Sequence, residues 1–231
     1  MSLFATVDVP CPACGTKVAF QAVNSVNAVG RPDLREAILR GTFQKQTCAK
    51  CGKEFRMDPR FSYIDAGRGQ WIATFPEPDL DSWRVREEEV LRLFDKAFGS
   101  GASPFAREIG KTLRPRLVFG WPALWEKLAI DDAGLDDVIV EIVKIGLLRN
   151  VPETPFALTN ELRFVRAPND GTRDLAFAWV DSTTTQFLQG MRVPRALYDE
   201  IAKDPDNSRA LRADFANATF VDLKRLVSTR A

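Results

Sequence analysis

The chain has 231 residues, of which 45% are hydrophobic, and this is enough apolar material for a sizeable core. Its 32 basic and 31 acidic residues give a net charge of +1, so it lacks the basic excess of a strong nucleic-acid-binding surface. It contains no histidine, which excludes Ser-His and Cys-His nucleophile pairs and zinc sites built on imidazole. Catalysis would have to rest on carboxylates, Lys or Tyr, whose spacing shows no catalytic motif.

The first residues carry no basic stretch followed by a long apolar run, so no signal peptide is predicted. No window approaches the ~18 apolar residues that a membrane-spanning helix needs. We therefore expect a cytoplasmic protein without membrane association, in a compartment where thiols stay reduced.

All four cysteines lie in two Cys-x-x-Cys-Gly motifs, which place Cys11 beside Cys14 and Cys48 beside Cys51. A two-residue spacer lets both sulfurs of a tight turn face one ion, and the following Gly supplies a positive φ where the chain leaves the turn. Redox dithiols and disulfides are the other interpretations, and the duplication of the motif favours metal. The sequence predicts one structural Cys₄ site for a single zinc ion, with iron as the alternative.

Strands are predicted on both sides of each cysteine motif, as expected of a zinc ribbon, and a short helix is predicted between the motifs. Its Pro suits the first helical turn, and Gly41 is placed to end it. Two further strands are joined by a turn at Gly67-Arg68-Gly69, which no helix follows, as a phosphate-binding loop would require. The predicted strands are 3–9, 17–23, 43–46, 54–57, 61–64 and 70–75, and the helix is 32–41.

Two prolines at 76 and 78 mark a boundary, after which helical periodicity dominates. The Glu87–Glu89 run predicts a solvated helix face. Gly134 and Asp136 predict the end of one helix and the cap of the next, and the aspartates around them match no calcium-binding loop. The predicted helices are 82–98, 105–113, 121–128 and 138–148, the last apolar nearly all round and therefore buried.

The C-terminal part returns to strands and then ends in helices. Residues 168–172 give a strong turn signal between two of the strands. The predicted strands are 158–165, 175–180 and 186–193, and the helices are 194–203, 208–214 and 221–227.

The chain resembles the bacterial CpXC family, named for its Cys-Pro-x-Cys motifs. Cys11-Pro12-Ala13-Cys14 fits the motif fully, and Tyr63-Ile64-Asp65 and the helical pair from Trp121 to Lys144 resemble later stretches of the family. The second motif departs from the family in having Ala49 where Pro would stand. The resemblance implies a metal site and supplies no reaction.

The predicted fold class is α+β: an N-terminal zinc ribbon with β-hairpins, an α-helical middle, and a C-terminal β-meander with helices. We expect a zinc-ribbon module over residues 1–78 and an α+β domain over residues 79–231, with helices in 80–149 and strands and helices in 156–231. The favoured function is a non-catalytic zinc-binding protein with a protein-interaction or regulatory role and an unidentified protein partner. The alternatives are a zinc ribbon that binds nucleic acid and, less favoured, an enzyme that uses carboxylates or a bound cofactor. Because the charge is nearly balanced, we expect no strong nucleic-acid binding.

Overall fold

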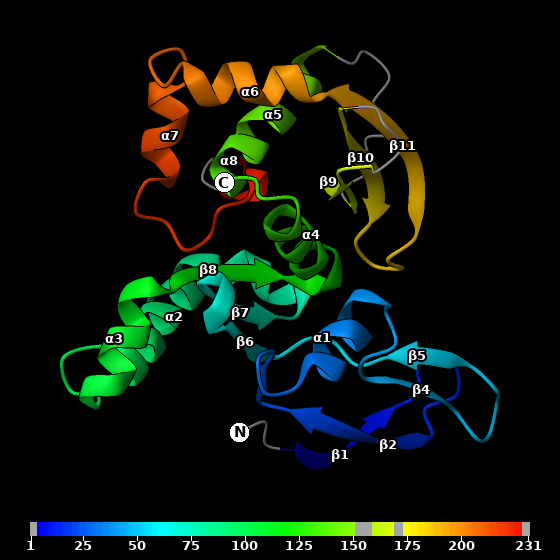
Figure 1. Cartoon of the computed structure of the whole chain (residues 1–231). Coiled ribbons are helices and arrows are strands. Elements are labelled where there is room, and N and C mark those ends of the chain that lie inside the picture. Colours follow the sequence, from blue (N-terminus) through cyan, green and yellow to red (C-terminus); the bar gives the residue numbers. More distant parts are fainter. Residues whose placement is uncertain (1–3, 151–158, 169–172, 228–231) are drawn as a thin grey trace.

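The computed structural model describes residues 4–150, 159–168 and 173–227, and it has an α+β architecture. Figure 1 shows two hairpins and α1 at one end, a central sheet, and a second sheet with helices at the other end, while α2 and α3 project sideways. The strands are β1 (Phe4–Pro10), β2 (Lys17–Val23), β3 (Ser25–Asn27), β4 (Lys45–Thr47), β5 (Glu54–Arg56), β6 (Phe61–Asp65), β7 (Gln70–Phe75), β8 (Arg114–Phe119), β9 (Asn160–Arg166), β10 (Asp174–Asp181) and β11 (Phe187–Pro194). The helices are α1 (Pro32–Leu39), η1 (Ala66–Arg68), η2 (Glu77–Ser82), α2 (Trp83–Phe98), α3 (Pro104–Thr112), α4 (Gly120–Asp132), α5 (Asp137–Asn150), α6 (Arg195–Lys203), α7 (Arg209–Phe215) and α8 (Leu223–Val227).

The central sheet has the strand order β3-β6-β7-β8. Strands β6 and β7 are antiparallel, whereas β3 pairs with β6 and β8 pairs with β7 in parallel. All six residues of β7 are buried because both faces of the sheet are covered. The boundary predicted at residue 78 falls between β7 and β8 in the sequence, so strands from both predicted regions share this sheet.

Helices α1 and α4 pack against one face of the central sheet, and α2 packs against the other. On the first face Ile72 and Val118 contact a core that includes Ile38 and Leu124. The core on the second face consists of Trp71, Ala73, Phe75, Leu113, Leu117 and Phe119, of Trp83 and Val90 from α2, and of Phe220 from the C-terminal segment. The sheet is thus the middle layer between two helical layers.

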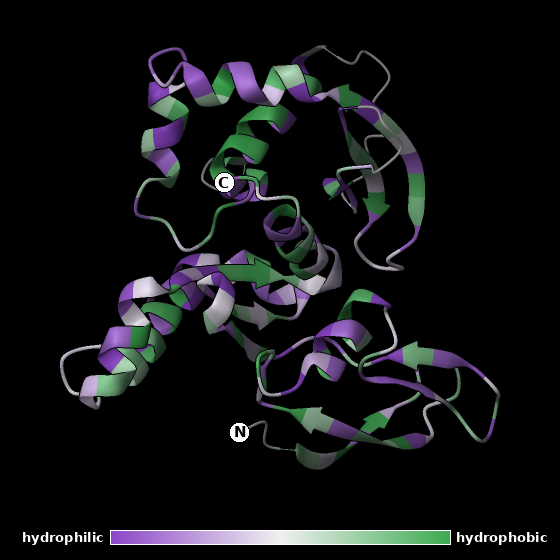
Figure 2. Ribbon diagram, in the orientation of Figure 1, coloured by the Kyte–Doolittle hydropathy of each residue, from purple (hydrophilic) through white to green (hydrophobic). Residues whose placement is uncertain are grey.

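The second sheet is an antiparallel meander with the order β11-β10-β9. It encloses a separate core with α5 and α6, in which Phe164 and Phe177 meet edge to face. Helix α5 buries Ile139, Val140 and Val143, and it is hydrophobic along much of its length in Figure 2. Helix α4 joins the two halves, because it contributes buried residues to both cores.

A segment between α7 and α8 crosses back to the central sheet. The N–H of Leu117 in β8 donates to the carbonyl oxygen of Thr219 at 2.9 Å, and Phe220 packs against Trp83 and Phe119. We call residues 215–222 the C-terminal strap. It connects the C-terminal helices to α2 and β8 through Thr219 and Phe220.

Most of the elements expected from the sequence are present, with shifts of a few residues at their ends. Asp136 Oδ1 accepts the N–H groups of Val138 and Ile139, and Gly134 has φ +63°, as predicted for the junction of α4 and α5. The predicted turn at 168–172 lies largely outside the described residues, as do residues 158 and 228–231. Among the described residues, no helix combines the length and apolar character needed to cross a membrane.

Two expectations were wrong or incomplete. Glu87 does not belong to a solvated face, because it accepts the N–H groups of Thr219 and Phe220 at 2.9 and 3.0 Å and pairs with Arg225. The strands β3 and β8 were not expected at all. Both are edge strands that pair in parallel, and their partners lie far away along the chain.

Candidate metal centre

The two cysteine motifs fold into turns with the same hydrogen-bond pattern. In the first, the N–H of Cys11 donates to Thr16 O at 2.8 Å and the N–H of Gly15 donates to Cys11 O at 2.9 Å. In the second, the N–H of Cys48 donates to Lys53 O at 2.9 Å and the N–H of Gly52 donates to Cys48 O at 2.9 Å. Each turn is therefore a knuckle that fixes its own two cysteines.

The glycine that follows each knuckle is required by the backbone conformation. Gly15 and Gly52 have φ +69° and +71°, in the left-handed region that is unfavourable for residues with a Cβ. The space around both is open, so it is the dihedral angle that selects Gly and not crowding.

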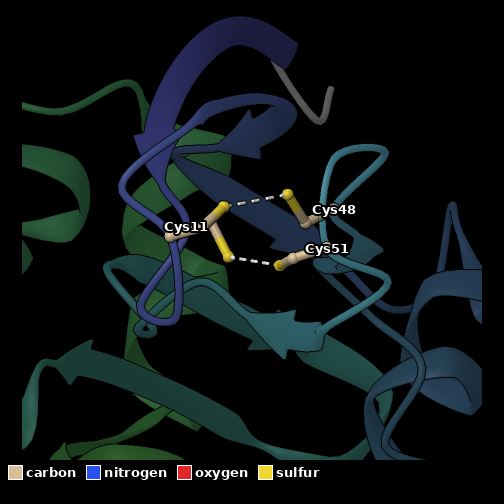
Figure 3. Close-up of side chains that lie close together, drawn as sticks. Cys11, Cys48 and Cys51 are labelled. Atoms are coloured by element: carbon tan, nitrogen blue, oxygen red, sulfur yellow. Dashed lines mark hydrogen bonds between the residues drawn. The ribbon is translucent and has the colours of Figure 1, made fainter.

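The four sulfur atoms come together between the knuckles (Figure 3). Cys11 Sγ lies 3.6 Å from Cys51 Sγ, Cys14 Sγ lies 3.6 Å from Cys48 Sγ, and all four sulfurs lie within 4.8 Å of one another. A disulfide would need about 2.05 Å. In a tetrahedron with Zn–S bonds of ~2.3 Å, the sulfurs are about 3.8 Å apart. The four cysteines, which we call the cysteine quartet, therefore have the separation of a tetrahedral metal site.

The electrostatics of the quartet also favour a bound cation. Hydrogen bonding with Thr16 lowers the pKa of the Cys14 thiol to about 6, and the two side chains are 3.4 Å apart. The backbone N–H of Lys53 lowers the pKa of Cys51, but hydrogen bonding with Cys14, partial desolvation, and hydrogen bonding with Cys11 and Cys48 raise it by more, to about 12. Four thiolates this close ionise together only when a cation offsets their mutual repulsion.

The hairpins on either side hold the knuckles face to face. The first knuckle joins β1 to β2 and the second joins β4 to β5, and the rings of Phe20 and Phe55 meet edge to face at 5.2 Å between these hairpins. The second hairpin is tied to α4, because Trp121 Nε1 donates to Met57 O at 3.1 Å and Arg56 stacks over Trp121 and Trp125.

A buried network of charges lies in the other half of the molecule, and it was not anticipated from the sequence. Glu126 is at its centre, where it accepts hydrogen bonds from Lys144 Nζ at 2.9 Å, Arg163 Nη1 at 2.8 Å and the N–H of Phe164 at 2.7 Å. Three further sets of ion pairs complete the network. Glu141 pairs with Lys144. Both Asp222 and Glu161 pair with Arg163, and Lys224 pairs with Glu161 and Glu77.

The carboxylates of this network are not arranged as a second metal site. Oxygens of Glu126, Glu141 and Asp222 lie within 4.8 Å of one another. However, the ammonium of Lys144 already takes the place of a cation, at 2.8 to 3.1 Å from Glu126 and Glu141. The network is best described as a structural cluster of ion pairs, in which each buried charge has a partner of opposite sign.

The sequence did contain one signal for this network. Glu141 and Lys144 interrupt an otherwise apolar helix at positions i and i+3, where both must be buried if the helix is buried all round. Their hydrogen-bond partners outside α5, Glu126 on α4 and the N–H of Leu223 in α8, could not be identified, because these elements are brought together only by the tertiary fold.

The pair of cysteine knuckles gives this layered α+β fold a zinc-ribbon-like N-terminal part, with four cysteines that could hold one metal ion. The model of the CpXC protein family matches residues 9–144, well over half of the chain, so the chain belongs to the CpXC family. The matched range contains all four cysteines, the central sheet and most of α5. Comparison with curated proteins and with solved structures found no match.

Proposed function

We propose that the chain is a non-catalytic zinc protein whose Cys₄ site stabilises a surface for a protein partner. The observation that carries this proposal is the closed donor set of the cysteine quartet. Four thiolates fill the tetrahedral shell of one zinc ion and leave no position for substrate or water, which is typical of structural sites and not of catalytic ones.

The surroundings of the quartet support an interaction role. Strand β1 is exposed along nearly its whole length and presents Phe4 and Val7 to solvent. Among the described strands, β1 pairs with β2 alone, so within this part of the chain its other edge is an unpaired one of the kind that extended segments of partner proteins bind. The metal would hold this hairpin in place, because the knuckle between β1 and β2 supplies half of the ligands.

The metal itself is tested by elemental analysis of protein purified without chelators. We expect about one zinc per chain, as four cysteines complete one site. Iron in place of zinc would give a coloured protein and would leave the structural role unchanged, since iron also binds four thiolates. A folded protein without bound metal would contradict the proposal.

The interaction role is tested by photo-crosslinking in the native cell. A photoreactive residue replaces exposed Lys50 in the second knuckle and, as a matched control, exposed Lys111 on α3. We expect one protein to be captured from position 50, to be absent from position 111, and to be lost when the cysteines are replaced by Ser. Capture of nucleic acid, or binding to nucleic acid that survives physiological salt, would favour a nucleic-acid-binding ribbon.

A further inference from the structure

A cavity of about 260 Å³ lies between the central sheet and the turn from α4 to α5. No residue of the cysteine knuckles lines it, so it is separate from the metal centre. Every residue that lines it falls within 68–137, inside the range that matches the CpXC family. Its size suits a small metabolite, because drug-sized ligand sites begin at about 300 Å³.

One wall of the cavity is the polar end of the central sheet. In the parallel pairing of β7 with β8, Gln70 lies beside Arg114 and Ile72 lies beside Arg116. Residues so paired point to the same face, and Ile72 shows that this face is turned toward α4. The first residues of both strands therefore present an amide and two guanidinium groups to the cavity.

The opposite wall carries a buried ion pair. Lys127 Nζ lies 2.9 Å from Asp137 Oδ2, and Arg116 grips the same carboxylate through two bonds of 2.7 and 2.9 Å. Burial alone would raise the pKa of Asp137, but Lys127 and Arg116 hold it well below its usual range. These charges are fixed in place before any ligand arrives, as in a preorganised site.

Two residues that line the cavity have polar groups with unused hydrogen-bonding capacity. Gln70 is only 9% exposed, and no described group donates a hydrogen bond to its Oε1 atom. A buried acceptor of this kind is rare in native proteins and calls for a donor. Arg114 reaches Asp136 and Asp137 only at 3.5 and 3.9 Å, which is longer than a hydrogen bond with good geometry.

The balance of charge around the cavity favours an anion. Arg68 is neutralised by Asp131 and Asp132, and Asp137 is shared between Arg116 and Lys127. Arg114 is the cation with the weakest pairing among the lining groups. The 14-residue helix α5 begins at Asp137, so the positive end of its dipole also lies at the cavity.

We propose that this cavity binds a small organic anion, a carboxylate or a phosphate ester, that carries a hydroxyl group close to the anionic group. The anion meets Arg114 and the hydroxyl donates to Gln70 Oε1. The two groups must lie within a few bonds of each other, because neighbouring strands are only about 4.8 Å apart.

The test uses isothermal titration of the full-length, metal-loaded protein with two matched pairs of probes. Glycerate is compared with propionate, and glycerol 3-phosphate with propyl phosphate, since the members of each pair differ in hydroxyl groups. We expect at least one hydroxylated probe to bind with a dissociation constant below about 10 mM. It should bind about tenfold more tightly than the matched probe without the hydroxyl groups, which is the factor expected for one hydrogen bond.

Three variants locate the binding. Arg114→Gln should weaken the binding of both probes of a pair. Gln70→Leu should abolish the difference in affinity between the two probes without lowering the midpoint of thermal unfolding of the protein. Lys111→Gln removes a charge from α3 outside the cavity and should change neither affinity. The proposal is overturned if no hydroxylated probe binds, or if binding is the same in Arg114→Gln and Gln70→Leu as in the unchanged protein.

Discussion

Glu141 is a carboxylate of α5 that has no contact with solvent. Burial raises its pKa to about 7; Lys144 at 2.8 Å acts against the shift, while Glu126 and Asp222 add to it. The folded protein therefore keeps a proton that the unfolded chain has lost above its ordinary pKa of 4.5. Because the folded state binds more protons in this range, the free energy of unfolding contributed by Glu141 falls as the pH rises from about 4.5 to 7.

The substitution Glu141→Gln should remove this decline. Gln keeps an oxygen for the N–H of Leu223, which donates to Glu141 at 3.0 Å, and it does not titrate. Urea unfolding at pH 5 and pH 7 is expected to show the variant gaining stability relative to the unchanged protein as the pH rises. Metal release at low pH affects both proteins alike and cancels in the comparison. Parallel stability profiles would contradict the assignment.

At the scale of residues, the sequence predicted that the four cysteines come together, and it did not predict the charge network. The four cysteines could be recognised because each knuckle is a local turn in which the spacing alone brings two sulfurs together. In the network, Glu126 meets Lys144 and Arg163 from two other elements, and Arg163 meets Asp222 from the C-terminal strap. No local pattern records such partners.

At the scale of elements, the C-terminal strap depends on Glu87 of α2. Its Oε1 atom accepts two backbone N–H groups of the strap, and its carboxylate pairs with Arg225 at 2.8 Å. Replacement by Ala leaves those N–H groups without an acceptor in a partly buried position. We expect Glu87→Ala to lower the free energy of unfolding by about 1.5–3 kcal/mol, the range for hydrogen bonds to a charged group.

The neighbouring Glu88 provides the control, because it lies on the same helix and is exposed. Glu88→Ala should change stability by no more than about 0.5 kcal/mol, as is usual for surface positions. Equal losses in the two variants, measured by chemical denaturation, would show that the strap is not held by Glu87.

Helices and hairpins were predicted well because their signals are local, while β8 was missed for a physical reason. It begins with Arg114-Pro115-Arg116, which reads as neither an alternating nor an apolar strand. Pro115 is tolerated because β8 is an edge strand. Strand β8 pairs with β7 although the helices α2 and α3 separate the two strands in the sequence. Parallel pairing across such a distance leaves no trace in a short window of sequence.

At the scale of the whole molecule, we expect loss of the metal to disorder only the knuckles and their hairpins. Cys48→Ser removes one ligand, and zinc-binding energy is folding energy in such modules. Strands β6 and β7 should remain folded, since Phe61 and Ile72 share a core with Leu124 of α4. Limited proteolysis of the variant should therefore cut at residues 4–23 and 44–57 and leave a fragment that begins near residue 60.

The start of that fragment also tests the division predicted at residue 78. A stable fragment beginning near residue 79 would support two separate regions with that boundary, and one that retains β6 and β7 would move the boundary before residue 61. Uniform degradation, or a digestion pattern like that of the unchanged protein, would show that the knuckles are not a separately stabilised element.

The long sequence distance from the second knuckle to Asp222 and Lys224 has a consequence for synthesis. Both knuckles have left the ribosome long before these residues are made; at 5–20 residues per second, translation from Cys51 to Lys224 takes roughly 10–35 s. During that interval the nascent chain can already hold its metal, while Arg163 still lacks Asp222 and Glu161 still lacks Lys224. A ribosome-stalled chain that ends before residue 215 should therefore bind zinc and yet be digested by protease from β8 onward, because the second half of the molecule matures only once Asp222 and Lys224 have been made.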